Sequence, residues 1–371
     1  MRSAIGMCLS KTLLCIMLIL LAGVCSARAD IVVTDIKDRE VTMPAPATRI
    51  LLASSFQYPA LAILDVDAAK RVVGIGANPG ETLPEAERDL SDTPRVGSIW
   101  SQSFSIEKTL ELRPDVVIAA PLSPVWSQKL ETVLSKAGIP IVYVDFDENP
   151  FRNTDRSFEI LGRVLGAQDK ASEFIDFYHQ HVRAITERMA RPELVRPTLL
   201  MMLRGPGVPC CLALPANDVT DYFGATGVEN IAGVTNGAPV QLSLESIIER
   251  DPDIFVVIDV FSDARSLFGL PRTLAHGMAA LKTLRQEPGL GGIAAMRSGR
   301  VHALDSYLMR SPLSFLSFEA LAKWIQPELF ADVDPQATLD EINRRFLKTP
   351  LRGPFWTSFD PTIDRMPGGN Q

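Results

Sequence analysis

The chain has 371 residues, of which 46% are hydrophobic and 22% charged, and its formal net charge is −7. This length allows two domains of ordinary size, and the hydrophobic content excludes wholesale disorder. The sequence contains no cluster of lysine and arginine, so its charge pattern argues against a nucleic-acid partner.

The first 29 residues have the features of a secretory signal peptide. Basic residues precede an apolar stretch over 12–24, and Ala27-Arg28-Ala29 has the small-x-small form of a cleavage site. We therefore expect residues 1–29 to be removed before Asp30, with the mature protein in the periplasm. The apolar stretch is shorter than the roughly 20 residues that a membrane-spanning helix needs, which disfavours an anchor. A lipid attached at Cys25 remains an alternative.

Two cysteines, Cys210 and Cys211, remain after the predicted cleavage, and they are adjacent in the sequence. In an oxidising compartment they could form a vicinal disulfide or stay reduced. Neither state joins two domains, so the stability of each domain must come from its own core.

The mature chain is predicted to begin with a β-hairpin, since Ile31–Thr34 and Glu40–Met43 are β-prone runs on either side of a polar turn. Short apolar runs then alternate with helical patterns, and each run is bounded by Gly, Pro or polar residues. These runs are Ile50–Ala53, Val72–Ile75, Val116–Ala119 and Ile141–Val144. Fully apolar short strands that alternate with helices are typical of an α/β fold with a parallel sheet.

A helical region follows from Asn153, with a break near Leu165 and a second helix from Asp169 to Met189. A helix of roughly 20 residues is about 30 Å long, which is the width of a small domain. A second α/β series comes after it, with strands predicted at Leu199–Leu203, Ile254–Ile258 and Val301–Leu304. The predicted order is a signal peptide (1–29), an N-terminal lobe (30–152), connecting helices (153–192) and a C-terminal lobe (193–371).

A repeated segment links the two halves of the chain. Residues 105–118 and 243–256 share Ser, Glu, Glu, Pro and Asp at the same positions without a gap. Each copy predicts an N-cap serine, a short helix, a proline that ends it and a buried strand. Two such copies imply two structurally equivalent Rossmann-like lobes, each with a central parallel sheet. A ligand cleft is then expected between the lobes, at the carboxyl ends of the strands.

The repeat and several shorter motifs resemble the iron-siderophore, haem and cobalamin binding proteins of ABC importers, and the resemblance covers residues 31–348. The shorter motifs are Thr34-Asp35, Arg39–Pro44, Arg49-Ile50, Val73–Ile75, Pro94–Gly97, Gly138–Val142, Gly227–Asn230, Gly299–Val301 and Pro327–Phe330.

This resemblance implies a periplasmic, monomeric solute-binding protein whose two lobes are joined by one long helix and close only slightly on the ligand. It implies that arginines of the importer's membrane subunits grip one exposed glutamate on each lobe, here Glu107 and Glu245. The expected ligand is a ferric siderophore or a similar metal chelate. The same fold could instead bind haem, cobalamin or an oxyanion such as molybdate, and a sensor that binds a partner protein is a further alternative.

Ligand contacts are expected on loops that follow the strands of both lobes. Aromatic faces suit aryl or macrocyclic ligands, and arginine forks suit anionic chelates. The candidates are Tyr58, Trp100 and Trp126 in the first lobe, and Arg204, Tyr307 and Arg310 in the second.

Histidine usage argues against a bare metal ion as the ligand. None of the four histidines (His179, His181, His276 and His302) lies in the first lobe, so a zinc or manganese site built by both lobes is not expected. We expect no resident cofactor, although a tyrosine could ligate haem. The sequence also has no G-x-S-x-G, P-loop or H-E-x-x-H motif, which argues against an enzyme.

Overall fold

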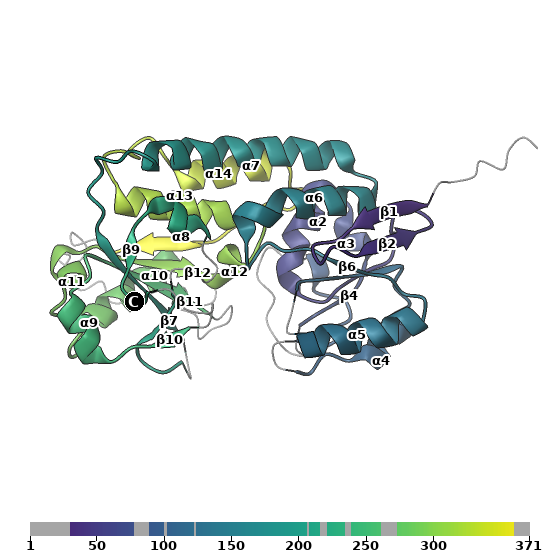
Figure 1. The fold of residues 1–371 in the computed structure, drawn as a ribbon, viewed down its shortest axis with the longest axis horizontal. Helices are drawn as coiled ribbons and strands as arrows, with labels where there is room; N and C mark the ends of the chain where they lie inside the picture. The colour runs from purple at the N-terminus through teal and green to yellow at the C-terminus, as the bar shows by residue number, and fades with distance from the viewer. Residues whose placement is uncertain are drawn as a thin grey trace, which may run out of the picture.

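The structure, a computed structural model, describes residues 30–77, 89–99, 102–121, 124–205, 208–215, 221–233, 239–260 and 273–359. It consists of two α/β lobes side by side, with one long helix lying along both of them (Figure 1). The predicted two-lobed α/β fold is therefore confirmed.

The N-terminal lobe begins with the predicted hairpin, in which β1 (Ile31–Thr34) pairs antiparallel with β2 (Glu40–Met43). The buried carboxylate of Asp35 sits inside the turn. It accepts hydrogen bonds from the backbone amides of Lys37 at 2.9 Å and Arg39 at 3.2 Å, and from the guanidinium of Arg39. One carboxylate thus satisfies the polar groups of the turn and holds the hairpin closed.

Four parallel strands form the central sheet of this lobe, in the order β4-β3-β5-β6. They are β3 (Ile50–Leu52), β4 (Val72–Ile75), β5 (Val116–Ala119) and β6 (Ile141–Tyr143). The helices are η1 (Ser55–Gln57), α2 (Tyr58–Leu64), α3 (Ala68–Arg71), α4 (Ile106–Leu112) and α5 (Pro124–Lys136). Successive side chains of β3 point to opposite faces of the sheet. Ile50 and Leu52 pack toward α2, whereas Leu51 packs toward α4 and α5.

Two helices connect the lobes. The first, α6 (Pro150–Leu165), ends at Gly166, which adopts the left-handed conformation (φ 72°) that glycine favours at helix ends. The second, α7 (Gln168–Met189), has 22 residues and packs against α6 on one side and α13 on the other. The predicted break near Leu165 is therefore confirmed.

The C-terminal lobe has a parallel centre and antiparallel edges, in the order β10-β8-β7-β11-β12-β13, with β9 paired to the start of β7. The central strands are β7 (Thr198–Arg204), β11 (Ile254–Asp259) and β12 (Val301–Asp305). The outer strands are β8 (Leu212–Ala213), β9 (Glu229–Asn230), β10 (Val240–Gln241) and β13 (Trp356–Ser358). The three predicted strands thus form the parallel centre, and the antiparallel edges are additions that the sequence patterns did not reveal.

The helices of this lobe are α8 (Asp221–Thr226), α9 (Leu244–Arg250), α10 (Leu274–Arg285), α11 (Ala294–Ser298), α12 (Ser306–Met309), α13 (Ser314–Ile325) and α14 (Pro335–Arg345). The alternating side chains of β7 and β11 divide the core into two clusters. Leu200 and Met202 face α9, α10 and α11, while Leu199 and Met201 face α13.

One apolar cluster runs without interruption from the N-terminal sheet through α2, α6, α7 and α13 to the C-terminal sheet. Phe174 of α7 is fully buried in this cluster, where it packs against Phe158 of α6 and Phe315 of α13 at ring-centroid distances of 4.5 and 6.4 Å. The lobes are therefore joined by a continuous packed core as well as by the connecting helices. In the ranges that the structure describes, no helix is long and apolar enough to cross a membrane.

Candidate functional site

A pocket lies where the carboxyl ends of the N-terminal strands meet the C-terminal lobe. Its lining comes from the segments after β3, β5 and β6, from Ile99, and from one residue of the C-terminal lobe. The lining residues are Ala53, Ser54, Phe56, Gln57, Ile99, Ala120, Val144, Phe146, Asp147 and Arg310. This is the edge of a parallel sheet at which α/β proteins bind their ligands.

Gln57 carries an amide that is buried in the wall of this pocket. The chain leaves β3, forms the short helix η1 and enters α2 directly, which places Gln57 at the N-cap of α2. Its side chain is only 4% exposed, and neither amide atom has a hydrogen-bond partner among the described residues. Burying an unpaired amide is costly. A bound polar group that supplied the missing partners would recover that cost.

Asp147 is held at the mouth of the pocket by a turn that Asp145 organises. The buried carboxylate of Asp145 accepts hydrogen bonds from the backbone amides of Asp147 and Glu148 at 2.9 and 2.8 Å. It also accepts one from Asn149 at 3.1 Å, just before α6 begins. The direction of the Asp147 side chain is therefore set by the backbone of this turn.

Arg310 faces Asp147 from the other lobe. It follows α12, whose start is fixed by Asp305, because the Asp305 carboxylate accepts a hydrogen bond from the backbone amide of Tyr307 at 2.8 Å. The Nε atom of Arg310 lies 3.8 Å from Oδ1 of Asp147, so an ion pair crosses the gap between the lobes. Removal from water raises the pKa of Asp147 above its usual value, although the charge of Arg310 opposes the shift.

The pocket therefore combines a guanidinium from one lobe with an amide and a carboxyl from the other, between apolar walls that include Phe56 and Phe146. A guanidinium recognises carboxylates and other oxyanions through paired hydrogen bonds, and aromatic walls suit an apolar or aryl body. This arrangement can hold a small ligand that has both an anionic group and an apolar part.

Of the predicted ligand contacts, Arg310 lines the pocket and the two tyrosines do not. Tyr58 is 3% exposed and Tyr307 is 1% exposed, so both lie in the core. Tyr307 packs against Phe56 at 5.6 Å between ring centroids, behind the wall of the pocket. Neither ring belongs to the described pocket lining, so the contact of these two tyrosines with the ligand stays a prediction.

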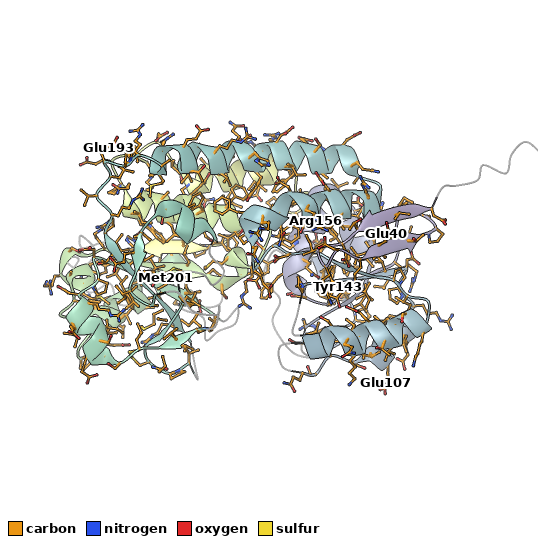
Figure 2. The ribbon with its side chains drawn as sticks, viewed as in Figure 1. Glu40, Glu107, Tyr143, Arg156, Glu193 and Met201 are labelled. Carbon is orange, nitrogen blue, oxygen red and sulfur yellow. A yellow bond between two sulfur atoms is a disulfide. The ribbon has the colours of Figure 1, made fainter. Side chains whose placement is uncertain are left out.

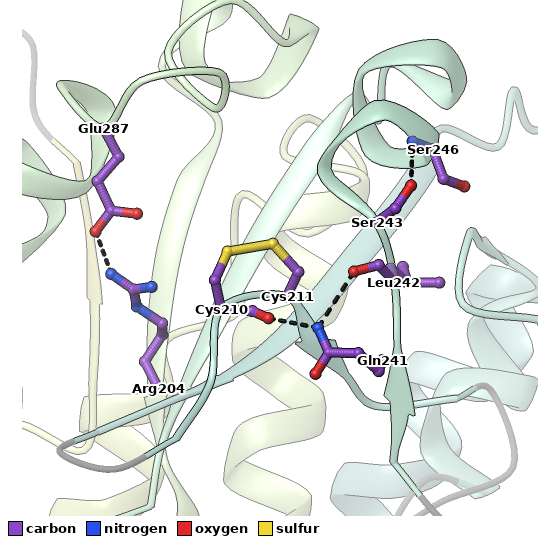
Figure 3. The surroundings of a disulfide bond; sticks show 8 residues. All are labelled: Arg204, Cys210, Cys211, Gln241, Leu242, Ser243, Ser246 and Glu287. Atoms are coloured by element: carbon purple, nitrogen blue, oxygen red, sulfur yellow. Dashed lines mark hydrogen bonds and ion pairs between the residues drawn. A yellow bond between two sulfur atoms is a disulfide. The ribbon is translucent and has the colours of Figure 1, made fainter.

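Arg204 and the two tryptophans also fall outside the described pocket lining. Arg204 ends β7 and forms an ion pair with Glu287, which leaves the arginine side chain 24% exposed (Figure 3). It is bound to its own lobe and is absent from the described lining. Trp100 lies outside the described residues. Trp126 belongs to α5, but its side chain is also outside them.

Sequence reasoning missed Gln57 and Asp147. Both follow strands of the N-terminal sheet, so the rule that ligands bind at the carboxyl ends of strands could have identified them. Aromatic and basic residues were expected to contact the ligand instead, and a glutamine before a helix resembles an ordinary surface residue.

The repeated segments fold in the same way in the two lobes. The Oγ atoms of Ser105 and Ser243 each accept a hydrogen bond, at 3.1 Å, from the backbone amide three residues later, which caps α4 and α9. Glu107 and Glu245 are exposed in the first turns of these helices. Among the described residues neither carboxylate has a hydrogen bond or an ion pair. Both helices lie on the side of the sheets away from α7, and Figure 2 labels Glu107 on the outer edge of the first lobe.

The aspartate of each repeat ties its strand to the neighbouring one. Oδ2 of Asp115 accepts hydrogen bonds from the amide and hydroxyl of Thr48, just before β3, at 2.9 and 2.8 Å. Oδ2 of Asp253 accepts the same pair from Thr198, at the start of β7, at 2.8 and 3.0 Å. The two lobes are thus structurally equivalent around α4 and α9, as the repeat predicted.

The histidines of the described chain are engaged with other side chains. Nε2 of His179 lies 2.6 Å from Asp155, and Nδ1 of His181 lies 2.7 Å from the buried Glu319. His302 is buried in the C-terminal lobe. Within the described ranges, no three His, Cys, Asp or Glu side chains are grouped so that they could hold a metal ion.

Comparisons with known proteins agree with this geometry. The family model described as "Periplasmic binding protein" matches residues 53–308. The molybdate-binding protein MolA of Haemophilus influenzae is 24% identical over 87% of this chain and 93% of its own length. An uncharacterised ABC transporter substrate-binding lipoprotein of Bacillus subtilis, YvrC, is 23% identical over 71% of this chain and 75% of its own length.

Solved structures share the fold. The TroA-like periplasmic binding protein FepB from Veillonella parvula superposes with a TM-score of 0.76 at 24% identity, covering 89% of this chain and 100% of that one. MolA of Haemophilus influenzae bound to molybdate gives a TM-score of 0.66 at 20% identity, with 89% and 99% covered. A periplasmic haem-binding protein of Pseudomonas aeruginosa gives 0.59 at 21% identity, with 85% and 98% covered. With two lobes, an interlobe pocket and a family match over most of its length, the chain belongs to the periplasmic binding protein family.

Proposed function

We propose that this protein is the solute-binding component of an ABC importer and that it carries an anionic metal chelate such as a ferric siderophore. The observation that carries the proposal is the interlobe pocket, which Arg310 of one lobe lines together with Gln57 and Asp147 of the other, between aromatic walls. The family match supports the role in import, because members of this family bind solutes in the periplasm.

The chemistry of the pocket favours an anion with an apolar or aryl body. Arg310 supplies a positive charge, and burial raises the pKa of the Asp147 carboxyl opposite it. Phe56 and Phe146 supply apolar surface.

A molybdate-type oxyanion is the second candidate. It is supported by the similarity to MolA, which is described as binding molybdate. The amide of Gln57 and the guanidinium of Arg310 are both hydrogen-bond donors, and such donors are what an oxyanion requires.

Binding to a ligand panel tests the proposal. Calorimetric titration of the mature protein would use ferric catecholate, hydroxamate and citrate-type siderophores, haem, cobalamin, molybdate and free divalent metals. We expect one ferric siderophore to saturate the protein, and Arg310→Gln to weaken it at least about tenfold, because a charged hydrogen bond is lost. Arg204→Gln is the matched control, since Arg204 is paired with Glu287 away from the pocket lining. Saturation by molybdate alone would favour the second candidate, and a greater loss in Arg204→Gln would refute the site.

We propose that Glu107 and Glu245 dock the protein onto the membrane subunits of the importer. Both carboxylates are exposed at equivalent positions of the two lobes, and neither is paired within the described residues. Two charges at a fixed separation set the orientation in which the protein docks on the membrane subunits and steer its approach to them electrostatically. Importer reconstituted in lipid vesicles should lose most of its stimulated ATP hydrolysis with Glu107→Gln and Glu245→Gln, while ligand affinity is unchanged. Glu111→Gln with Glu249→Gln, exposed later in the same helices, is the control, and an equal loss in that control would contradict the docking role.

We also propose that export removes residues 1–29 and that the mature protein is a monomer. The intact mass of the periplasmic protein should correspond to a chain beginning at Asp30, and light scattering should give the mass of one chain. A lipid-modified species beginning at Cys25 would contradict the proposed cleavage.

A further inference from the structure

Cys210 and Cys211 form a disulfide in the loop between β7 and β8 (Figure 3). Cys210 is exposed, whereas Cys211 is 3% exposed and belongs to the apolar cluster that contains Ile247 of α9. Cys211 has a φ of 73°, in the left-handed region that residues with a side chain rarely adopt. The disulfide therefore occurs where Cys211 has a left-handed backbone conformation, which this residue would tend to leave if the disulfide were broken.

The backbone carbonyls of both cysteines hold the segment that leads into α9. The amide of Leu242 donates to the carbonyl oxygen of Cys211 at 2.9 Å. The side-chain amide of Gln241 donates to the carbonyl oxygen of Cys210 at 2.5 Å (Figure 3). These bonds continue the pairing of β8 with β10, so the disulfide loop and the approach to α9 form one hydrogen-bonded ladder.

The end of this ladder is the cap of α9. Leu242 immediately precedes Ser243, whose Oγ caps the helix by accepting from the amide of Ser246 at 3.1 Å. Glu245 lies in that first turn, only three residues beyond Leu242. Leu244, between them, packs against the apolar cluster that also contains Cys211. The position of the Glu245 backbone thus depends on a segment that both cysteine carbonyls hold.

We propose that the Cys210–Cys211 disulfide is a redox-sensitive clamp on α9, which holds Glu245 in place for the importer when it is oxidised and loosens the start of the helix when it is reduced. The proposal rests on the docking role of Glu245. The reductant is a dithiol: its two sulfurs join, the Cys210–Cys211 bond breaks, and each cysteine sulfur takes up one of the two protons released. The described lining of the interlobe pocket contains no residue of this loop or of α9, so ligand affinity is independent of the clamp.

Hydrogen exchange tests the structural half of the proposal without the importer. The full mature protein is compared oxidised and after reduction by a dithiol that is then removed. Exchange over residues 239–250 should become about fivefold faster or more on reduction, since a backbone hydrogen bond loses its constraint. The equivalent segment 102–112 in the first lobe, which contains no cysteine, is the internal control. Unchanged exchange over 239–250 would overturn the proposal.

Stimulation of the importer tests the functional half. The concentration of loaded protein that gives half-maximal ATP hydrolysis in vesicles should rise about fivefold on reduction and return on reoxidation, with ligand affinity unchanged. Cys210→Ser with Cys211→Ser should behave like the reduced protein. If this variant does not fold, the reversible reduction of the native protein carries the test. If Glu245→Gln impairs the stimulation of ATP hydrolysis and reduction of the disulfide does not, the proposed clamp is refuted. If Glu245→Gln has no effect on stimulation, the docking role itself fails.

Discussion

His302 should make the C-terminal lobe sensitive to acid. The imidazole is buried, stacks on the indole of Trp324 at 4.3 Å between ring centroids, and its Nδ1 lies 2.9 Å from the hydroxyl of Ser358. Burial, with a smaller contribution from the charge of Arg300, lowers the pKa of His302 from 6.5 to about 3. The folded protein therefore keeps this ring neutral at a pH where the unfolded chain protonates it.

The sign and the size of the effect follow from this difference. Because the folded pKa is depressed, the stability that His302 contributes is fully present above pH 6.5 and is lost as the pH falls from 6.5 toward 3. One pKa unit corresponds to about 1.4 kcal/mol, so a fall from pH 7 to pH 4.5 should cost about 3 kcal/mol at this one residue. That is a large part of the stability of an ordinary domain, roughly 5–15 kcal/mol.

The assay is urea unfolding of the native protein and of His302→Asn at pH 7 and pH 4.5. Asn has an amide near the position of Nδ1 but does not titrate, so the variant should lose about 3 kcal/mol less than the native protein between the two pH values. The variant's lost stacking lowers its stability at both pH values and cancels in the difference. His276→Asn, at an exposed helical position, controls for removing an imidazole. Equal losses in the native protein and His302→Asn would refute the reasoning.

Three further predictions concern the pocket and the repeat. Asp147→Asn should melt at a higher temperature than the native protein at pH 7, because the raised pKa of Asp147 means that ionising this carboxyl destabilises the folded state. The difference in melting temperature should vanish below pH 3.8, where the carboxyl is protonated in both states. A lower melting temperature of the variant at pH 7 would contradict this. Asp253→Ala removes the acceptor of two hydrogen bonds and should lower the free energy of unfolding by about 2 kcal/mol in urea titration, whereas a change below about 0.5 kcal/mol would show that the link is dispensable. Gly76→Ala would place a β-carbon 2.0 Å from the carbonyl oxygen of Ala53 in the pocket wall, so the melting temperature and the ligand affinity should both fall. Gly224→Ala is the control, because the space around Gly224 is open, and it should leave the ligand affinity unchanged.

Much of the fold could be predicted because its central strands are apolar on both faces. The runs at Val72–Ile75 and Val116–Ala119 coincide with β4 and β5 at both ends. The strand predicted at Leu199–Leu203 extends by one residue at each end, to Thr198 and Arg204, because ladder pairing does not depend on an apolar side chain. Outer strands such as β8 and β10 have only two residues each, too few to show any periodicity.

The site was harder to predict because a residue type does not reveal its partner. Arg204 ends the central strand β7 and Arg310 follows the short helix after β12, yet Arg204 pairs with Glu287 in its own lobe and Arg310 reaches the pocket. Tyr58 is next to Gln57 in the sequence, but helical geometry turns the tyrosine into the core and leaves the glutamine in the pocket wall. Such distinctions depend on packing between segments that are distant in the sequence.

The uninterrupted apolar core beneath α7 has a consequence for how much protein a cell should make. Separating the lobes widely would expose the aromatic cluster around Phe174, so we expect empty and loaded protein to keep nearly the same spacing between α4 and α9. An importer that grips these two helices would therefore also be occupied by empty protein. Excess binding protein over ligand then acts as a competitive inhibitor of uptake, and transport is fastest when production of the protein is matched to the supply of its solute.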